Sequence, residues 1–565
     1  MPHLCTDILI VGAGGAGMYA AIAAARNGAS VLLLDKGQVG RGGATIMAQM
    51  TVAVALGEQE PDTVELHFKD TLNAGRGLCN EELSLLLCED GPRRIREMAD
   101  WGTRWAQEDG HVKQEMAPGH SVKRCCYVDF LNTGPAVAAT LRRKVSEIAA
   151  IRRLSNLAVI EILVGDGQVM GAIALDLVSG RFLSIQAKAV ILAAGGLTKL
   201  FARNSASANM GGEAYALALW AGAELIDMEF VQFFPIGHLA PRLVGMDPIM
   251  WDPFRYKLGG KLLNGNFEEF IDRYGSSDFG KYNATRDIAA YAILKEVEAG
   301  RGTPHGGAYL DFRHIAEAQL RAAFGPVIDR LLTNGIDLTK TPVEVGPMAH
   351  YHMGGVRADK NMRTRIAGLH AAGEAVGGAN GANRLSGNAI TEAFVFGARA
   401  GSSAADYARG AVLQWDERIV GEKIEKFDSV RQTRLTDSPT PIAVQTELQD
   451  LMWKKAGPFR TGAKLAAALA RIEQMQRELR QLCVGGEKRF NLDLHDWFEL
   501  RAMLTTAEAV VKSALARTES RGAHQREDFP APDDRLLMNQ VVALSNDAMA
   551  TTWTEPVRLK EQPAG

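Results

Sequence analysis

The stretch that decides the fold is DILIVGAGGAGMYAAIAAARNGASVLLLDK, residues 7–36. Its first apolar run predicts a buried strand, its alanine-rich part predicts a helix, and SVLLLDK (30–36) predicts a second strand. Gly12, Gly14 and Gly17 stand between the first strand and the helix. Glycines at these positions permit a tight turn and let a pyrophosphate approach the backbone, while the helix N-terminus stabilises its negative charge. The stretch therefore predicts a dinucleotide-binding βαβ unit of the Rossmann type.

Further segments extend this prediction. Asp35 ends the second strand, where a carboxylate can accept a hydrogen bond from a ribose and disfavours a ribose phosphate, so FAD or NAD fits better than NADP. Residues 36–43 follow and are placed to wrap the second half of a dinucleotide. VILAAGG (190–196) is a second strand-to-glycine turn, typical of flavin-binding folds. The glycine-rich stretch 350–401 ends in an apolar helix pattern, and we expect it to complete the site.

Composition excludes several classes of function. The 565 residues hold 63 Lys and Arg against 66 Asp and Glu, a formal net charge of -3, which argues against nucleic acid or an anionic membrane as a general partner. The uncharged run 8–25 is interrupted by glycines and has no basic segment before it, so we expect neither a membrane helix nor a signal peptide. Six cysteines, none with CxxC spacing, predict no metal or iron–sulfur site in this chain and a cytoplasmic location.

The pattern along the chain predicts four parts. We expect a Rossmann-type domain that begins at 1–240 and returns at 350–410, an inserted domain at 241–349, and a C-terminal helical domain at 411–565. Turn signals predict a meander of four strands in residues 158–192. Helices are expected at 62–73, 81–100, 134–150, 212–223, 286–299, 314–334, 443–456, 463–482 and 496–517.

Motifs along almost the whole chain resemble the flavoprotein subunits of succinate dehydrogenase and fumarate reductase, a family that includes L-aspartate oxidase and adenylylsulfate reductase. The motifs that carry the resemblance are GAGGAG (12–17), AAGG (193–196), AELIDMEFVQFFPIG (223–237), TRD (285–287), HYHMGG (350–355), GEAVGGANGANRLSGN (373–388), FRTG (459–462) and RTESRGAHQREDFP (517–530). The resemblance implies an α/β fold with a Rossmann-type FAD-binding domain, an inserted α+β capping domain and a C-terminal helical domain.

The resemblance also implies site residues. Those matching the FAD site are Gly12, Gly14, Gly15, Ala16, Gly17, Asp35, Lys36, Gly43, Ala44, Thr45, Gln49, Ala194, Gly195, Gly196, Glu374, Arg384, Ser386 and Asn388. His350 and Arg384 match the family's carboxylate clamp, and a guanidinium fork suits a carboxylate. Arg286 matches the arginine proposed to deliver a proton while hydride passes between flavin N5 and the substrate. Without the family resemblance, Arg286 and Asp287 would be interpreted as a surface pair at the start of a helix.

The chain departs from the family at three places. Ala44 stands where members with covalent FAD have a histidine, so we predict non-covalent FAD. Phe234 and Ile236 replace the histidine and threonine of an H-P-T-G motif, and residues 252–260 do not match a second capping-domain motif. A carboxylate facing Phe234 and Ile236 would lack hydrogen bonds. We therefore expect a substrate with one carboxylate and an apolar or bulkier far end, not succinate or fumarate. If Arg255, Tyr256 or His238 supplies a replacement polar contact, a dicarboxylate substrate remains an alternative.

The sequence has no iron–sulfur cluster motif, so electrons must leave the flavin by another route. We expect an FAD-dependent oxidoreductase acting on CH–CH or, second, CH–NH bonds. Its electrons would pass to a separate iron–sulfur or ferredoxin-like subunit, or directly to oxygen as in L-aspartate oxidase. A flavin-bearing subunit that only relays electrons is a further alternative.

Overall fold

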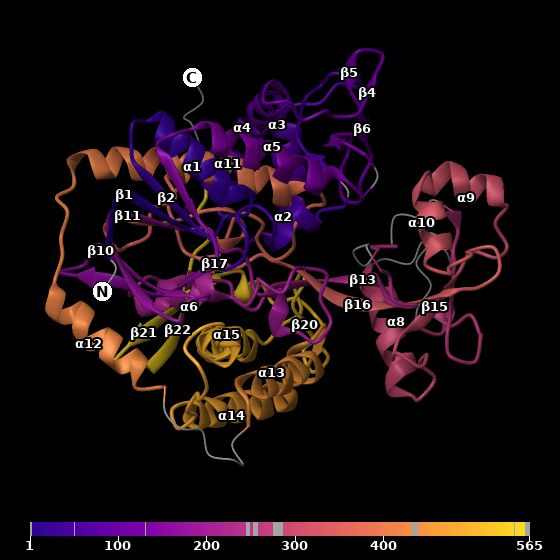
Figure 1. Ribbon diagram of the computed structural model, residues 1–565. Coiled ribbons are helices and arrows are strands. Elements are labelled where there is room, and N and C mark those ends of the chain that lie inside the picture. The colour runs from indigo at the N-terminus through magenta and orange to yellow at the C-terminus, as the bar shows by residue number, and fades with distance from the viewer. Residues whose placement is uncertain are drawn as a thin grey trace. The chain divides into compact units, whose positions relative to one another are not determined.

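The computed structural model describes residues 3–49, 51–129, 131–244, 249–251, 258–274, 286–431, 439–546 and 548–559. The chain forms two compact units (Figure 1). The first comprises Met1–Ala202, Ala206–Val231 and Tyr351–Gly565, and the second comprises Arg203–Ser205 and Gln232–His350.

The first unit is built on a largely parallel sheet with the order β8-β2-β1-β11-β10-β9, to which β18 adds beside β11. Its strands are β1 (His3–Val11), β2 (Val31–Leu34), β8 (Ile151–Leu154), β9 (Leu157–Gly165), β10 (Gln168–Asp176), β11 (Phe182–Leu192) and β18 (Leu369–Ala371). β1 runs parallel to both β2 and β11, whereas β9 and β10 are antiparallel additions. This is the predicted Rossmann-type α/β arrangement. The meander has three strands, because RFLSIQ and KAVIL form the single strand β11.

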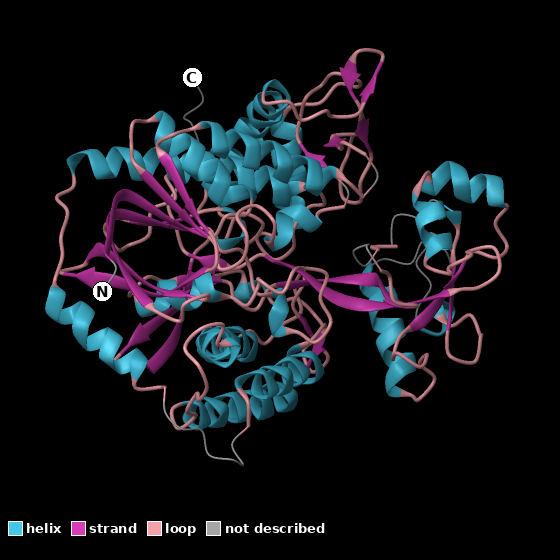
Figure 2. Cartoon of the chain, in the orientation of Figure 1, coloured by secondary structure: helices cyan, strands magenta, loops and turns pink. Residues whose placement is uncertain are grey.

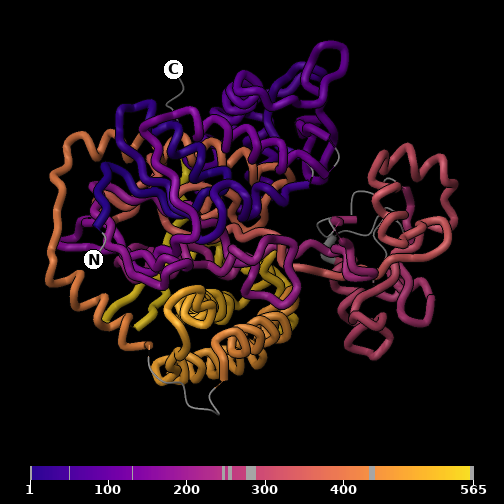
Figure 3. The backbone as a smooth tube through the Cα atoms, in the orientation of Figure 1, coloured from indigo at the N-terminus to yellow at the C-terminus, as the bar shows by residue number. Residues whose placement is uncertain are grey.

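The helices of the first unit cover this sheet (Figure 2). They are α1 (Gly15–Arg26), α2 (Gly43–Met47), α3 (Val64–Ala74), α4 (Glu81–Asp100), α5 (Thr133–Glu147), α6 (Glu213–Trp220) and α11 (Asn388–Gly410), with short η1 (Thr198–Leu200) and η3 (Gly373–Ala375). α1 packs along α11 although hundreds of residues separate them, as the indigo and orange segments show (Figure 3). Two glycines allow this approach: a Cβ at Gly397 would lie 2.6 Å from the carbonyl oxygen of Ala16, and one at Gly401 2.2 Å from that of Ala20.

Small strands and the C-terminal elements complete the first unit. The small strands are β3 (Val52–Ala53), β4 (Gln107–Glu108), β5 (His111–Val112), β6 (Gln114–Glu115), β7 (Cys125–Cys126), β12 (Leu225–Ile226), β17 (Gly355–Val356), β19 (Phe459–Arg460) and β20 (Gln525–Arg526). The C-terminal elements are α12 (Glu417–Asp428), α13 (Pro441–Ala456), α14 (Gly462–Leu479), α15 (Leu492–Ala516), η4 (Asp534–Leu536), β21 (Asn539–Ser545) and β22 (Ala548–Thr554). The hairpin β21–β22 differs from the expected all-helical C-terminal part. It joins β12 and β17 in one sheet.

The second unit is an α+β unit with the sheet order β13-β16-β15-β14. Its elements are β13 (Val231–Ala240), β14 (Lys261–Leu263), η2 (Ile271–Tyr274), α8 (Arg286–Glu298), β15 (Ala308–Asp311), α9 (Glu317–Phe324), α10 (Val327–Thr333) and β16 (Val343–His352). The single helix expected at 314–334 is two helices, because Gly325 takes φ +52° and Pro326 follows it. In the described part of the chain, no helix combines the length and the apolar character that crossing a membrane requires.

Candidate functional site

The glycines of the first turn differ in what surrounds them. A Cβ on Gly12, whose φ is +99°, would lie 2.5 Å from the carbonyl oxygen of Ala193, and a Cβ on Gly17 would lie 1.9 Å from that of Gly12. At Gly14 a Cβ would meet nothing within 4 Å. Gly12 and Gly17 are thus required by packing, whereas Gly14 faces open space at the start of α1. A ligand phosphate can approach the backbone there.

Asp35 lies beside this turn. Its carboxylate accepts hydrogen bonds from the N–H groups of Ala13 at 2.9 Å and Gly37 at 2.7 Å. Burial raises the pKa of the Asp35 carboxyl above its usual range, and the two N–H donors oppose this shift. The carboxylate predicted to accept a ribose hydroxyl is therefore held in a fixed orientation next to the glycine turn.

The side chain of Lys36 is engaged by carboxylates of two helices. Its ammonium pairs with Glu213 of α6 and, at 2.5 Å, with Glu499 of α15. Burial alone would lower the pKa of Lys36, but the two carboxylates outweigh it and raise that pKa. Lys199 also pairs with Glu499. Lys36, one of the residues predicted to bind the cofactor, thus connects the end of β2 to α6 and to the C-terminal helix α15.

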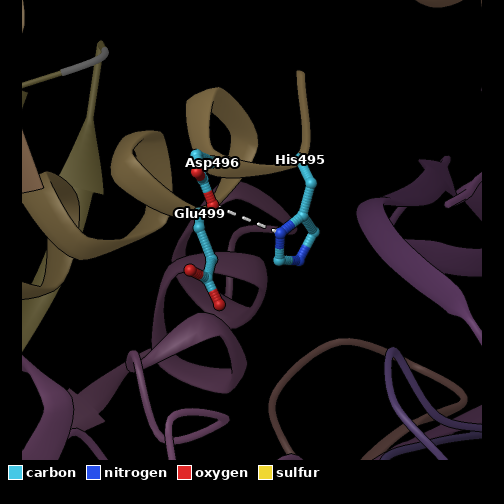
Figure 4. A group of neighbouring side chains, drawn as sticks. All are labelled: His495, Asp496 and Glu499. Atoms are coloured by element: carbon cyan, nitrogen blue, oxygen red, sulfur yellow. Dashed lines mark ion pairs between the residues drawn. The ribbon is translucent and has the colours of Figure 1, made fainter. Parts of the chain in front are cut away.

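A group of potential metal ligands lies next to these lysines. His495, Asp496 and Glu499 present ligand atoms within 4.8 Å of one another (Figure 4). Nδ1 of His495 lies 3.5 Å from Asp496, but Glu499 already accepts two ammonium groups. Two cations at the same carboxylate repel a metal ion. We assign the group to the ion-pair network around Lys36.

The second glycine turn and α2 close the site around the first turn. The N–H of Ala193 donates to the carbonyl of Val11 at 2.8 Å, so Ala194, Gly195 and Gly196 continue directly from the end of β11. A Cβ on Gly196 would lie 2.3 Å from Oε1 of Glu374, which places these two predicted residues in contact. Little room exists for any larger residue at this position.

α2 is connected to the glycine turn by hydrogen bonds. Oγ1 of Thr45 accepts from the N–H of Gly15 at 3.1 Å, and Oγ of Ser207 accepts from the N–H of Gly43 at 2.9 Å. Ala44 lies within α2 and is only half-buried, and Gln49 follows two residues after its end. The predicted residues of this segment therefore lie together with Gly15 and Ala16 at one end of α1.

The N-terminus of α11 supplies backbone groups, while its first side chain points elsewhere. Asn388 begins the helix, and its side chain bonds Nε2 of His67 at 2.9 Å and Oγ1 of Thr71 at 3.2 Å. Burial lowers the pKa of His67 to about 3, so its ring is neutral at physiological pH and donates through Nε2–H. The carbonyl of Ser386 lies 2.7 Å from Nε2 of His120. The part of the helix that can face a ligand is therefore the backbone at its N-terminus, where a partial negative charge is stabilised.

Arg384 is buried in the first unit. Its guanidinium carbon lies 4.4 Å from the ring centroid of Tyr351, and Nη1 donates to the carbonyl of Leu385 at 3.3 Å. Oε1 of Glu374 accepts from the backbone N–H of His352 at 3.1 Å, and burial raises the pKa of Glu374 to about 8. The ring of His352 is fully buried and has both nitrogens within hydrogen-bonding distance of partners, Tyr215 and the Met228 carbonyl, which makes it a structural residue.

The second unit holds the remaining predicted residues. Nδ1 of His350 lies 2.8 Å from Oγ of Ser205, and its ring lies 5.5 Å from that of Phe234. Phe234 packs with Met250 and Met348, and Ile236 is fully buried. These contacts surround Phe234 with apolar side chains.

Three other predicted positions complete the account of the second unit. His238 lies between the indole N–H of Trp251 at 3.1 Å and the carbonyl of Pro241 at 2.5 Å. Arg286 is the first residue of α8, and its side chain lies outside the described residues. Arg255 and Tyr256 also lie outside them.

The first-unit site fits a flavin dinucleotide. Two glycine turns meet there, a helix N-terminus faces it, and a Cβ on Gly14 or Gly43 would meet nothing within 4 Å. Comparison with known families agrees: the model described as FAD binding domain matches residues 7–390, and that described as Fumarate reductase flavoprotein C-term matches 445–564. The chain belongs to the fumarate reductase flavoprotein family. FAD is its cofactor, and the chain is of the FAD-dependent oxidoreductase type.

Similar proteins match this chain over nearly its full length. A subunit of the fumarate reductase (CoM/CoB) from Methanothermobacter marburgensis is 36% identical over 527 residues, covering 93% of this chain and 94% of that protein. An L-aspartate oxidase from Streptomyces coelicolor is 31% identical over 550 residues, covering 96% of this chain and 92% of that protein. The solved structure of Mycobacterium smegmatis Sdh1 in complex with UQ1 has a TM-score of 0.91 at 32% identity, covering 100% of this chain and 96% of that chain.

The structure also identifies residues near the site that sequence reasoning missed. Ser207 holds Gly43, and the small polar run SASAN at 205–209 was its only signal. His67 and His120 contact the start of α11 from segments distant in sequence, so no local pattern could have indicated them. Glu392 was concealed in the apolar pattern of α11, where it is fully buried.

Proposed function

We propose that this chain oxidises or reduces a small substrate with one carboxylate and an apolar or bulkier far end, and that succinate and fumarate are not its physiological substrates. When bound, FAD supplies hydride transfer at its N5 atom. The observation that carries the proposal is the apolar environment of Phe234 and Ile236, at the positions where the family pattern has a histidine and a threonine.

Two facts about these side chains support it. Phe234 is 9% exposed and packs with Met250, Met348 and the ring of His350. Ile236 is 0% exposed. Neither offers a hydrogen bond, and an ionised carboxylate that lost its partners on burial would cost several kcal/mol. His238, which could have replaced them, is already engaged by Trp251 and Pro241.

The residues that would act on the substrate are Arg384, His350 and Arg286. Arg384 would hold the carboxylate by a bidentate pair, and His350 would add a donor whose ring is oriented by Ser205. Arg286 would donate the proton that accompanies hydride transfer. Because arginine holds its proton tightly, the reverse step needs a relay, for which Asp287 is the neighbouring carboxylate.

A separate iron–sulfur subunit is the proposed electron partner. The relative from Methanothermobacter marburgensis is named as one subunit of a larger enzyme, and the C-terminal part of this chain matches the model described as Fumarate reductase flavoprotein C-term. None of the six cysteines of the sequence has CxxC spacing. Co-purification of a brown, iron-containing protein with the chain is the expected result.

An L-aspartate oxidase activity is the second candidate, supported by the relative from Streptomyces coelicolor. It predicts hydrogen peroxide formation when the FAD-loaded chain is incubated with L-aspartate in air. No peroxide above that with D-aspartate would remove it from consideration.

The main test is anaerobic. The FAD-loaded chain is mixed with a panel of monocarboxylic and dicarboxylic acids, and loss of the oxidised flavin absorbance is followed. We expect bleaching by an acid with an apolar far end and slow or no turnover of fumarate with reduced viologen. Robust fumarate turnover would contradict the proposal and restore the dicarboxylate interpretation.

A further inference from the structure

A buried acid lies behind Arg384 in the first unit. Glu392, on α11, is 0% exposed. Its Oε2 accepts a hydrogen bond from the hydroxyl of Tyr351 at 2.5 Å and another from Nδ2 of Asn380 at 2.8 Å. Its Oε1 has no hydrogen-bond partner among the residues that the structure describes. The Tyr351 ring in turn lies under the guanidinium of Arg384, at 4.4 Å. An acid, a phenol and a guanidinium thus form one continuous chain.

The electrostatics of this chain are unusual for a glutamate. Within the described ranges, no lysine or arginine forms an ion pair with Glu392. Burial raises the pKa of Glu392 to about 7, while its hydrogen bonds from Tyr351 and Asn380 and the charge of Arg384 oppose that shift. The titratable groups that face it or couple to it are Tyr351, Tyr215, Glu374 and Arg384. Its charge therefore changes near neutral pH, where the charge of Arg384 does not.

We propose that Tyr351 and Glu392 are positioning residues that hold the guanidinium of Arg384 and set how strongly it attracts a substrate carboxylate. This rests on the proposed role of Arg384 in binding that carboxylate. A guanidinium over an aromatic face is held by the electron density of the ring, and a hydrogen bond from the phenol to an anion increases that density. Ionised Glu392 also repels a second carboxylate brought to Arg384. Protonation of Glu392 removes that repulsion.

The proposal predicts a direction for pH dependence. Below neutral pH Glu392 is protonated and carboxylate binding is tight. Above it Glu392 is charged and binding weakens. If a bound carboxylate shifts the pKa of Glu392 by about one unit, reciprocity requires that its affinity change by about tenfold across the transition.

The same unit contains a matched control. The hydroxyl of Tyr19, on α1, donates to Glu97 on α4, and the guanidinium of Arg94 lies 5.7 Å from the Tyr19 ring. Here the acid is also paired with Arg94 at 2.8 Å and with Arg26, so its charge is compensated. Tyr19→Phe removes a tyrosine–glutamate hydrogen bond of the same kind without touching the chain behind Arg384.

The experiment uses the full FAD-loaded chain and three probes: acetate, benzoate and nitrate. Nitrate is planar and singly charged like a carboxylate and cannot be oxidised or reduced as an acid substrate would be. Dissociation constants are measured by calorimetry and by the flavin difference spectrum at about pH 6 and about pH 8.5, on either side of the Glu392 transition. Wild type and Tyr19→Phe are expected to bind about tenfold more weakly at the higher pH. Glu392→Gln should lose most of this pH effect, the remainder arising from Glu374, whose pKa burial raises to about 8, and Tyr351→Phe should show a reduced pH effect.

Two outcomes overturn the proposal: a Glu392→Gln variant that keeps the full wild-type pH dependence, or a wild-type chain whose nitrate and carboxylate affinities do not change with pH. If the pH dependence of binding originated in His350, the Glu392→Gln variant would retain it, which distinguishes the two sources. Failure of the proposed function gives a different result. In that case nitrate binds with the predicted pH dependence, while no monocarboxylic acid bleaches the flavin.

Discussion

Replacing Gly14 by alanine separates the cofactor-binding role of the glycine turn from its structural role. Gly14 has φ -70° and ψ -170°, which alanine adopts without strain, and a Cβ there would meet nothing within 4 Å. The folded apoprotein should therefore tolerate Gly14→Ala, with a gain of about 0.4–1 kcal/mol from the smaller entropy of the unfolded chain. The added Cβ would keep the pyrophosphate from approaching the backbone at this position. FAD should therefore lose one charge-assisted hydrogen bond, worth about 1.5–3 kcal/mol, which weakens its binding about 10- to 150-fold.

The matched variant is Gly17→Ala, whose Cβ would lie 1.9 Å from the carbonyl oxygen of Gly12. The Cβ is held directly by its own backbone and the clashing oxygen belongs to the backbone of Gly12, so the turn must deform, and we expect a destabilised apoprotein. Urea unfolding of the apoproteins measures stability, and quenching of flavin fluorescence measures FAD affinity. Wild-type FAD affinity in Gly14→Ala, or wild-type stability of the Gly17→Ala apoprotein, would refute the reasoning.

Three further predictions address other parts of the molecule. Because Ala44 offers no ring nitrogen for a covalent bond, acid precipitation should leave all yellow colour in the supernatant; colour in the pellet would contradict this. Phe234→His combined with Ile236→Thr should raise fumarate turnover with reduced viologen at least about tenfold, if each added polar group stabilises the second carboxylate by about 1 kcal/mol. Lys36→Met should destabilise the fold by about 3–5 kcal/mol at neutral pH, measured by urea unfolding, because it leaves buried carboxylates with too few partners. Burial raises the pKa of Glu499, but the two lysines outweigh it and lower that pKa to about 2, so its stabilising contribution is lost as pH falls below about 4.5 and the effect of Lys36→Met should shrink there.

The fold was predictable where local pattern and tertiary role agree. The glycines between 12 and 17 indicate a turn in the sequence, because backbone packing and the close approach of a pyrophosphate both require small residues there. The long helices α4, α13 and α15 were visible from their periodicity. The two halves of the 314–334 helix were not separated, because the apolar pattern continues across Gly325 and only the backbone shows the break.

Other features were beyond the reach of a single sequence. The family motif assigned Lys36 to the FAD site, but no local pattern could indicate that its carboxylate partners come from α6 and α15. The hairpin at 539–554 has an ordinary strand composition, but its pairing with β12 joins segments more than 300 positions apart. In the sequence Glu392 is one polar residue in an apolar helix pattern. Its proposed role follows only from its hydrogen bond with Tyr351, which is distant in sequence.

The pairing of β1 with β11 and of α1 with α11 bears on how the protein is made. Residues 3–26 leave the ribosome well before their neighbours on the sheet and in the helix layer, which are residues 182–192 and 388–410. Between these segments the ribosome must produce the entire second unit, Arg203–Ser205 and Gln232–His350, which has its own sheet and can fold meanwhile. We expect the N-terminal glycine turn to wait as an incomplete, apolar fragment during most of synthesis. FAD would then bind only after residue 410 has emerged, which makes cofactor supply a late step in assembly and chaperone capture an early one.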